Sequence, residues 1–181
     1  MELLDNLNKA FAFACERHSK QYRKATTIPY IVHIYEVYQY LREEGVDEEG
    51  LIAGILHDVV EDTGTSLEEI REKFGEGVAS LVDNESEDKS LPYIVRKKLH
   101  MDALKECGEK AKLINCADKL SNLRSIYLDI KYFKDDVWKK FNGTKDEIKH
   151  YYTMAIDALS SLEGHEIYSE LKRYFKLVFE N

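Results

Sequence analysis

Apolar residues recur at three- and four-residue spacing along most of this 181-residue chain, which is the pattern of amphipathic helices. Polar stretches at residues 20–28 and 84–90 interrupt the pattern and are typical of surface links. The spacing predicts helices over about residues 2–18, 29–45, 47–58, 66–74, 78–82, 92–106, 111–129, 144–162 and 166–179.

Residues that cap helices mark several of the predicted starts. Asp47 is a favourable N-cap for the helix that ends at residues 57–58. Ser66 with Glu69, and Thr144 with Glu147, form capping boxes. No repeat or linker divides the chain, and its length suits one domain with a substantial core. We therefore expect an all-α fold and a single domain over residues 1–181.

The charge balance narrows the classes of partner. The net charge is −8, with 34 acidic against 26 basic residues, which argues against nucleic-acid and anionic-membrane binding. The three cysteines form no CxxC pair, the N-terminus has no signal-peptide pattern, and no apolar run reaches the ~20 residues that span a bilayer. We expect a soluble cytoplasmic protein whose partner is a small molecule; the sequence is compatible with a homo-oligomer.

Candidate chemistry lies at the end of the apolar run at residues 51–56. His57 and Asp58 follow this run directly, and Glu61 and Asp62 come four positions later. Ionised groups at a buried helix end need a partner or a metal, because desolvation of an isolated carboxylate costs many kcal/mol. In a helix the i,i+4 pairs His57–Glu61 and Asp58–Asp62 each share a face. The alternative is a helix end with solvated acids and a capping histidine.

Two further polar residues stand among apolar neighbours. His33 lies on the helix after Pro29, and Asp118 lies in the segment 116–120. With His57 and Asp58 they make a mixed set of nitrogen and oxygen donors, which suits a divalent first-row metal with open positions better than structural zinc. Basic residues cluster near residues 20–24, 96–98 and 119–124. These clusters could bind phosphate or be solvated helix faces.

With these motifs in order, the sequence resembles the HD-domain phosphohydrolases, and among them the hydrolase domain of the RelA/SpoT enzymes in its small stand-alone form. The resemblance covers nearly the whole chain. It implies an HD-domain multi-helix bundle around a single metal site. The segments that carry it are Arg23-Lys24, Pro29-Tyr30-Ile31-Val32-His33, Leu56-His57-Asp58-Val59-Val60-Glu61-Asp62-Thr63, Glu87-Asp88-Lys89-Ser90-Leu91-Pro92 with Arg96-Lys97-Lys98, and Ala117-Asp118-Lys119-Leu120-Ser121-Asn122-Leu123-Arg124.

The resemblance also implies an activity and a role for each matching position. The activity is hydrolysis of ppGpp or pppGpp to GDP or GTP plus pyrophosphate, with Mn²⁺ as the metal. The implied metal ligands are His33, His57, Asp58 and Asp118, and the pair that activates the attacking water is Glu61 and Asp62. The implied substrate-binding residues are Arg23, Lys24, Arg96, Lys97, Asn122, Arg124 and Tyr151. Tyr151 is equally well explained as a core aromatic residue.

The sequence departs from the family pattern at two places. Glu147 stands where the small hydrolases tend to have an arginine; it can instead cap its helix, and Lys145 or Lys149 could supply the charge. Residues 82–86 lack the usual Val-Thr pairing. Two alternative functions stay open: a phosphatase acting on another nucleotide, such as the 2′-phosphate of NADPH, and a non-catalytic nucleotide-binding module. His18, His100, His150 and His165 are expected to be structural.

Overall fold

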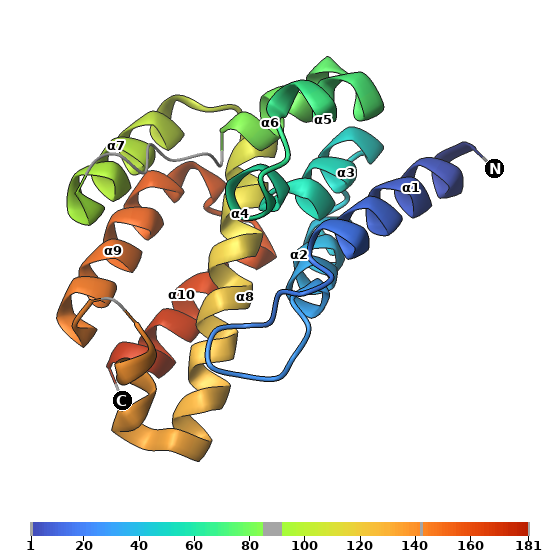
Figure 1. Ribbon diagram of the computed structural model, residues 1–181. Coiled ribbons are helices and arrows are strands. Elements are labelled where there is room, and N and C mark those ends of the chain that lie inside the picture. Colours follow the sequence, from blue (N-terminus) through green and yellow to red (C-terminus); the bar gives the residue numbers. More distant parts are fainter. Residues whose placement is uncertain (1, 85–91, 142, 181) are drawn as a thin grey trace.

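A computed structural model describes residues 2–84, 92–141 and 143–180, which form helices and contain no β-strand (Figure 1). This confirms the all-α class. The α-helices are α1 (Glu2–Arg17), α2 (Ile31–Glu43), α3 (Glu48–Leu56), α4 (Val59–Thr63), α5 (Leu67–Phe74), α6 (Glu76–Asp83), α7 (Tyr93–Glu106), α8 (Glu109–Phe133), α9 (Lys145–Ala158) and α10 (Glu166–Phe179). Two 3₁₀ helices are η1 (Lys134–Lys140) and η2 (Ser160–Leu162).

Helix α8 is the central element of the fold. It runs through the middle of the molecule, with α2 and α3 on one side and α9 and α10 on the other (Figure 1). Most of its first half is buried, including polar Asn115, Asp118 and Ser121. A polar side chain buried on a central helix requires a partner, so this half of α8 is where site residues are expected.

Helix α3 is buried on all sides, as its apolar sequence predicts. Every residue from position 50 to 56 is buried, and Asp47 caps the helix by accepting a hydrogen bond from the Gly50 N–H at 3.0 Å. Gly54 allows close packing against α2, because a Cβ at this position would lie 2.2 Å from Cδ1 of Leu41. Helices α2 and α3 are thereby held together just before the His57–Asp58 pair.

The regular helical geometry assumed for the i,i+4 pairs of residues 57–62 is interrupted in the structure, which corrects that expectation. Helix α3 ends at Leu56, Asp58 has φ −95° and ψ −6°, and α4 begins at Val59. The Nδ1 atom of His57 lies 2.8 Å from the Gly54 carbonyl oxygen, and this side chain–backbone bond accompanies the interruption. Gly64, in the left-handed region at φ 74°, ends α4.

The other predicted boundaries agree to within a few residues, with two exceptions. The helix predicted to reach residue 162 ends at Ala158 and is followed by η2, and η1 was not predicted. The Thr144–Glu147 capping box forms in both directions, and at Ser66 the Glu69 N–H donates to Oγ. The predicted loop at residues 84–90 lies, after residue 84, outside the described residues. Among the described helices, none is long and apolar enough to cross a membrane.

Candidate active site

Four side chains from three parts of the fold converge at one point. His33 comes from α2, His57 and Asp58 from the junction of α3 and α4, and Asp118 from α8. One potential ligand atom from each residue lies within 4.8 Å of the others. The Nε2 atom of His57 is 2.9 Å from Oδ2 of Asp58, and Nε2 of His33 is 3.2 Å from Oδ1 of Asp118. These are the four residues predicted as metal ligands.

Both imidazoles are oriented by bonds on the far side of the ring. Nδ1 of His57 lies 2.8 Å from the Gly54 carbonyl oxygen, and Nδ1 of His33 lies 2.8 Å from Oγ of Ser121. A carbonyl oxygen only accepts, so Nδ1 of His57 carries a hydrogen, and a neutral ring then has its lone pair on Nε2. The Nε2 atoms of His33 and His57 are buried and make no well-directed hydrogen bond, although carboxylate oxygens lie close by. Two buried nitrogens facing two carboxylates fit a divalent cation between them.

The charges in the group stabilise one another. Burial alone lowers the pKa of His57, but the Asp58 and Asp118 carboxylates outweigh it and the pKa is raised well above its usual value. Burial raises the pKa of Asp58, but His57 and His33 hold it well below its usual range. For Asp118, burial is likewise outweighed, chiefly by Lys119. The carboxylates are therefore ionised near neutral pH, as metal ligands must be.

Further hydrogen bonds fix the two carboxylates. The Tyr30 hydroxyl donates to Oδ2 of Asp58 at 2.6 Å; burial and the Asp58 charge both raise the pKa of Tyr30, so it stays protonated. The Asn122 amide donates to Oδ1 of Asp118 and the Lys119 ammonium donates to Oδ2, each at 2.6 Å. Ligands held in this way are oriented before a metal binds.

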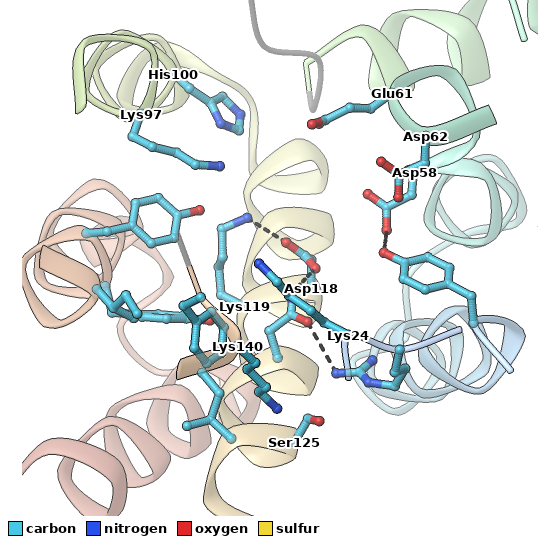
Figure 2. Close-up of a pocket in the computed structure, with 18 residues that line it drawn as sticks. Lys24, Asp58, Glu61, Asp62, Lys97, His100, Asp118, Lys119, Ser125 and Lys140 are labelled. Carbon is cyan, nitrogen blue, oxygen red and sulfur yellow. Dashed lines mark hydrogen bonds and ion pairs between the residues drawn. The ribbon is translucent and has the colours of Figure 1, made fainter. Parts of the chain in front are cut away.

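A cavity of about 370 Å³ opens beside this group and has an acidic and a basic side. Figure 2 shows Glu61, Asp62 and Asp58 on one side, and Lys97 and His100 opposite them. The carboxylates that line the cavity are Asp58, Glu61, Asp62 and Asp118, and the cations are Arg23, Lys24, Lys97, Lys119 and Lys140. Such a cavity suits a substrate whose phosphates lie between a metal and several cations.

Helix α4 and the polar link place the acidic pair. Both Glu61 and Asp62 line the cavity. Oδ2 of Asp62 accepts a bond from the Gln21 amide at 2.8 Å, and Oε1 of Gln21 lies 2.7 Å from Nδ1 of His18. His18, expected to be structural, is thus a neighbour of the residue that holds Asp62.

The predicted substrate residues divide into two groups. The five that line the cavity are Arg23, Lys24, Lys97, Asn122 and Tyr151. Tyr151 is also largely buried, with the Lys97 ammonium 5.0 Å from its ring centroid, so it is both a wall of the cavity and part of the core. The two that are not among the lining residues are Arg96 and Arg124.

Their positions in the fold explain the difference. Arg96 precedes Lys97 on α7, and adjacent helical residues point about 100° apart. The Arg124 guanidinium pairs with the carboxylate of Glu36 on α2, although its neighbours Ser125 and Ile126 on α8 line the cavity.

Several lining residues were not expected from the sequence. Tyr30 and Lys119 stand inside the matching segments but were given no role there, and His100 was expected to be only structural. His100 lines the cavity while its Nε2 contacts the Asn84 carbonyl at 2.9 Å. Lys140 of η1 also lines the cavity. Lys145, which could have supplied the charge missing at Glu147, lies over the Trp138 ring and is not among the residues that line the cavity.

Comparisons with known proteins agree with this geometry. The family model of the HD domain matches residues 10–146. A relative from Xenopus tropicalis, named guanosine-3′,5′-bis(diphosphate) 3′-pyrophosphohydrolase MESH1, is 38% identical over 159 residues, covering 86% of this chain and 84% of the relative. The human protein of that name is 34% identical and covers 94% of this chain and 93% of its own. The Aquifex aeolicus pyrophosphohydrolase is 33% identical, but the match covers only 21% of that longer protein.

Solved structures give the same result. A metazoan ortholog of SpoT described as hydrolysing ppGpp superposes with a TM-score of 0.77 at 32% identity, covering 94% of both chains. A crystal structure of lmo0812 from Listeria monocytogenes EGD-e has a TM-score of 0.77 at 31% identity and covers 82% of this chain. The resemblance to the small stand-alone hydrolases is confirmed, and the chain belongs to the HD domain family.

Proposed function

We propose that this protein hydrolyses the 3′-pyrophosphate of ppGpp and pppGpp, releasing GDP or GTP and pyrophosphate. The observation that carries the proposal is the pair Glu61 and Asp62, which lines the cavity beside the group of His33, His57, Asp58 and Asp118 and opposite Lys97. The relatives named as 3′-pyrophosphohydrolases, matched over nearly their full length, support the same assignment.

We propose Mn²⁺ as the metal, with His33, His57, Asp58 and Asp118 as its ligands. When bound, such an ion lowers the pKa of a water molecule and polarises a phosphoryl oxygen. Each histidine already presents Nε2 toward the carboxylates because its Nδ1 is engaged elsewhere. The hydrogen bonds to Nδ1 thus orient both imidazoles toward the place where the ion would bind.

The protein supplies the proton acceptor and the charge balance. We propose that Glu61 and Asp62 accept the proton of the attacking water, and that Gln21 holds Asp62 in place for this step. The Lys97 and Lys119 ammonium groups lie 5.0 and 5.9 Å from the centroid of the Tyr151 ring. Their charge offsets that of the pyrophosphoryl group as it passes from the ribose 3′-oxygen, which leaves with GDP or GTP, to the attacking water. Arg23 donates to Oδ1 of Asn122 at 3.3 Å, which places a third cation next to the metal group.

The test is a product assay with the purified protein, ppGpp and Mn²⁺. Pyrophosphate and GDP are expected from the wild type. The double variant Glu61→Ala/Asp62→Ala should release no pyrophosphate while still binding the metal. Glu72→Ala is a matched control, because it removes an exposed acid of the adjacent helix α5. Absence of pyrophosphate from the wild type would contradict the proposal.

The same assay separates the two alternatives. Inorganic phosphate from NADPH, with no pyrophosphate from ppGpp, would show that the site acts on a 2′-phosphate instead. Nucleotide that binds with saturating Mn²⁺ and stays uncleaved would show a non-catalytic binding module.

A further inference from the structure

A chain of hydrogen bonds connects the buried metal group to the protein surface. Nδ1 of His33 lies 2.8 Å from Oγ of Ser121, and this hydroxyl donates to Oε2 of Glu36 at 2.7 Å. The other oxygen of Glu36 accepts from the guanidinium of Arg124. His33 and Ser121 are fully buried, whereas the side chain of Glu36 is 23% exposed. The chain therefore crosses between α2 and α8, outside the substrate cavity.

The direction of each bond follows from the available hydrogens. Glu36, paired with Arg124, is an ionised carboxylate and can only accept, so the single hydrogen of the Ser121 hydroxyl points toward it. The Ser121 oxygen then has only lone pairs left for His33, so Nδ1 of His33 must donate. A neutral His33 ring consequently keeps its lone pair on Nε2, the atom that lies 3.2 Å from Oδ1 of Asp118.

We propose that Ser121 and Glu36 are positioning residues, which set the affinity of the metal site by holding His33 in the Nδ1–H tautomer. His57 obtains the same tautomer from the backbone carbonyl of Gly54, which no side-chain substitution removes. His33 depends instead on two side chains. The inference rests on the metal-site part of the proposed function and not on the identity of the substrate.

Direct binding of Mn²⁺ alone tests this proposal, with the free ion followed by electron paramagnetic resonance. Ser121→Ala removes the acceptor of His33. Glu36→Gln lets an amide donate to the Ser121 oxygen, so that the hydroxyl can turn and donate to Nδ1 of His33. Both variants should bind Mn²⁺ about 10–100-fold more weakly, the usual effect of losing such a partner. Glu43→Gln is the matched control, because it removes an exposed charge from the same helix and should leave the affinity unchanged.

Two readouts separate positioning from a general loss of structure. If Ser121 and Glu36 position His33, the rise in melting temperature on adding Mn²⁺ should shrink in the variants; a purely structural role would lower the melting temperature equally with and without metal. In the metal-free protein at alkaline pH, ¹⁵N NMR of the imidazole should show His33 protonated on Nδ1 in the wild type and partly on Nε2 in Ser121→Ala.

Wild-type Mn²⁺ affinity in both variants would overturn the proposal, as would an Nδ1–H tautomer that persists in Ser121→Ala. If Ser121→Ala does not fold, Glu36→Gln decides the question, because Glu36 is partly exposed and its replacement has the same shape. No nucleotide is added in the Mn²⁺-binding experiment. Unchanged Mn²⁺ affinity in the variants therefore does not contradict ppGpp hydrolysis, and a lack of ppGpp hydrolysis does not contradict a role for Ser121 and Glu36 in Mn²⁺ binding.

Discussion

At Gly54 helix α3, which leads into His57, packs closely against α2, which carries His33, and Gly54→Ala tests how much the site depends on that approach. The added methyl carbon would lie 2.2 Å from Cδ1 of Leu41 and 3.7 Å from Cγ1 of Val37. Because carbon atoms pack at about 3.5–4.0 Å, Leu41 would have to retreat by about 3.5 − 2.2 = 1.3 Å or more. Leu41 has no exposed surface, so it has no solvent to move into.

Two effects of opposite sign decide the stability of Gly54→Ala. Replacing glycine by alanine inside a helix gains about 1 kcal/mol from backbone propensity. Forcing an extra carbon into a packed core costs about 1–3 kcal/mol. The expected net effect is a destabilisation of about 0–2 kcal/mol, or a melting temperature lower by up to about 8 °C for a chain of this size. Mn²⁺ affinity should also fall, because the displaced Gly54 carbonyl holds Nδ1 of His57.

Thermal unfolding and Mn²⁺ titration of the variant provide the assay, with Gly77→Ala as the matched control. A methyl carbon at Gly77 would meet the carboxylate of Glu49, whose side chain is 48% exposed and can swing into solvent. The control gains helix propensity without core strain and should be neutral or stabilising. The reasoning is refuted if Gly54→Ala matches Gly77→Ala in stability and binds Mn²⁺ as the wild type does.

Three further predictions concern the elements around the site. Asp47→Ala should destabilise the chain by about 1 kcal/mol through loss of the α3 N-cap. Bonds from Lys110 and the Gly50 N–H lower the pKa of Asp47, so this contribution is present above the unfolded pKa of about 4 and is lost as pH falls through the lower folded pKa; acid unfolding curves of wild type and variant should converge. Gln21→Ala should lower kcat about tenfold, with a smaller change in KM, through loss of one bond to Asp62. Chelation of the metal should lower the melting temperature, since an ion that binds only the folded chain at 100 times its Kd stabilises it by about 2.7 kcal/mol; an unchanged value would contradict a metal site.

Much of the helical framework could be predicted because its signals are local. Apolar spacing located the helices, and Asp47 and Thr144 marked two starts that the structure reproduces. The interruption after Leu56 was not predictable from spacing, because it accompanies a bond from the His57 side chain to the Gly54 carbonyl. The segment Lys134–Lys140 was missed because a 3₁₀ helix with few buried residues leaves no apolar period to read.

The candidate ligands could be named from the sequence because they are polar residues in apolar surroundings. The residues that hold the site residues in place could not be named from the sequence, because each bonds to a residue far away along the chain. Glu36 and Ser121 are 85 positions apart, and Gln21 and Asp62 are 41 positions apart. On its own, each of these residues looks like part of a solvated helix face or loop. Arg124 was a candidate for substrate binding through the family resemblance, and its pairing with Glu36 on α2 could not be read from the sequence.

The break between α3 and α4 lies where two adjacent residues, His57 and Asp58, join one candidate site. In a continuous helix, neighbouring side chains diverge by about 100°. At the break, Nε2 of His57 and Oδ2 of Asp58 lie only 2.9 Å apart, with the His57 ring anchored to the end of α3. The Asp62 N–H bond to the Asp58 carbonyl then restores helical geometry, so that Glu61 and Asp62 line the cavity one turn later. The interrupted stretch therefore contributes two of the four candidate ligands and, one turn later, the acidic pair to the same cavity.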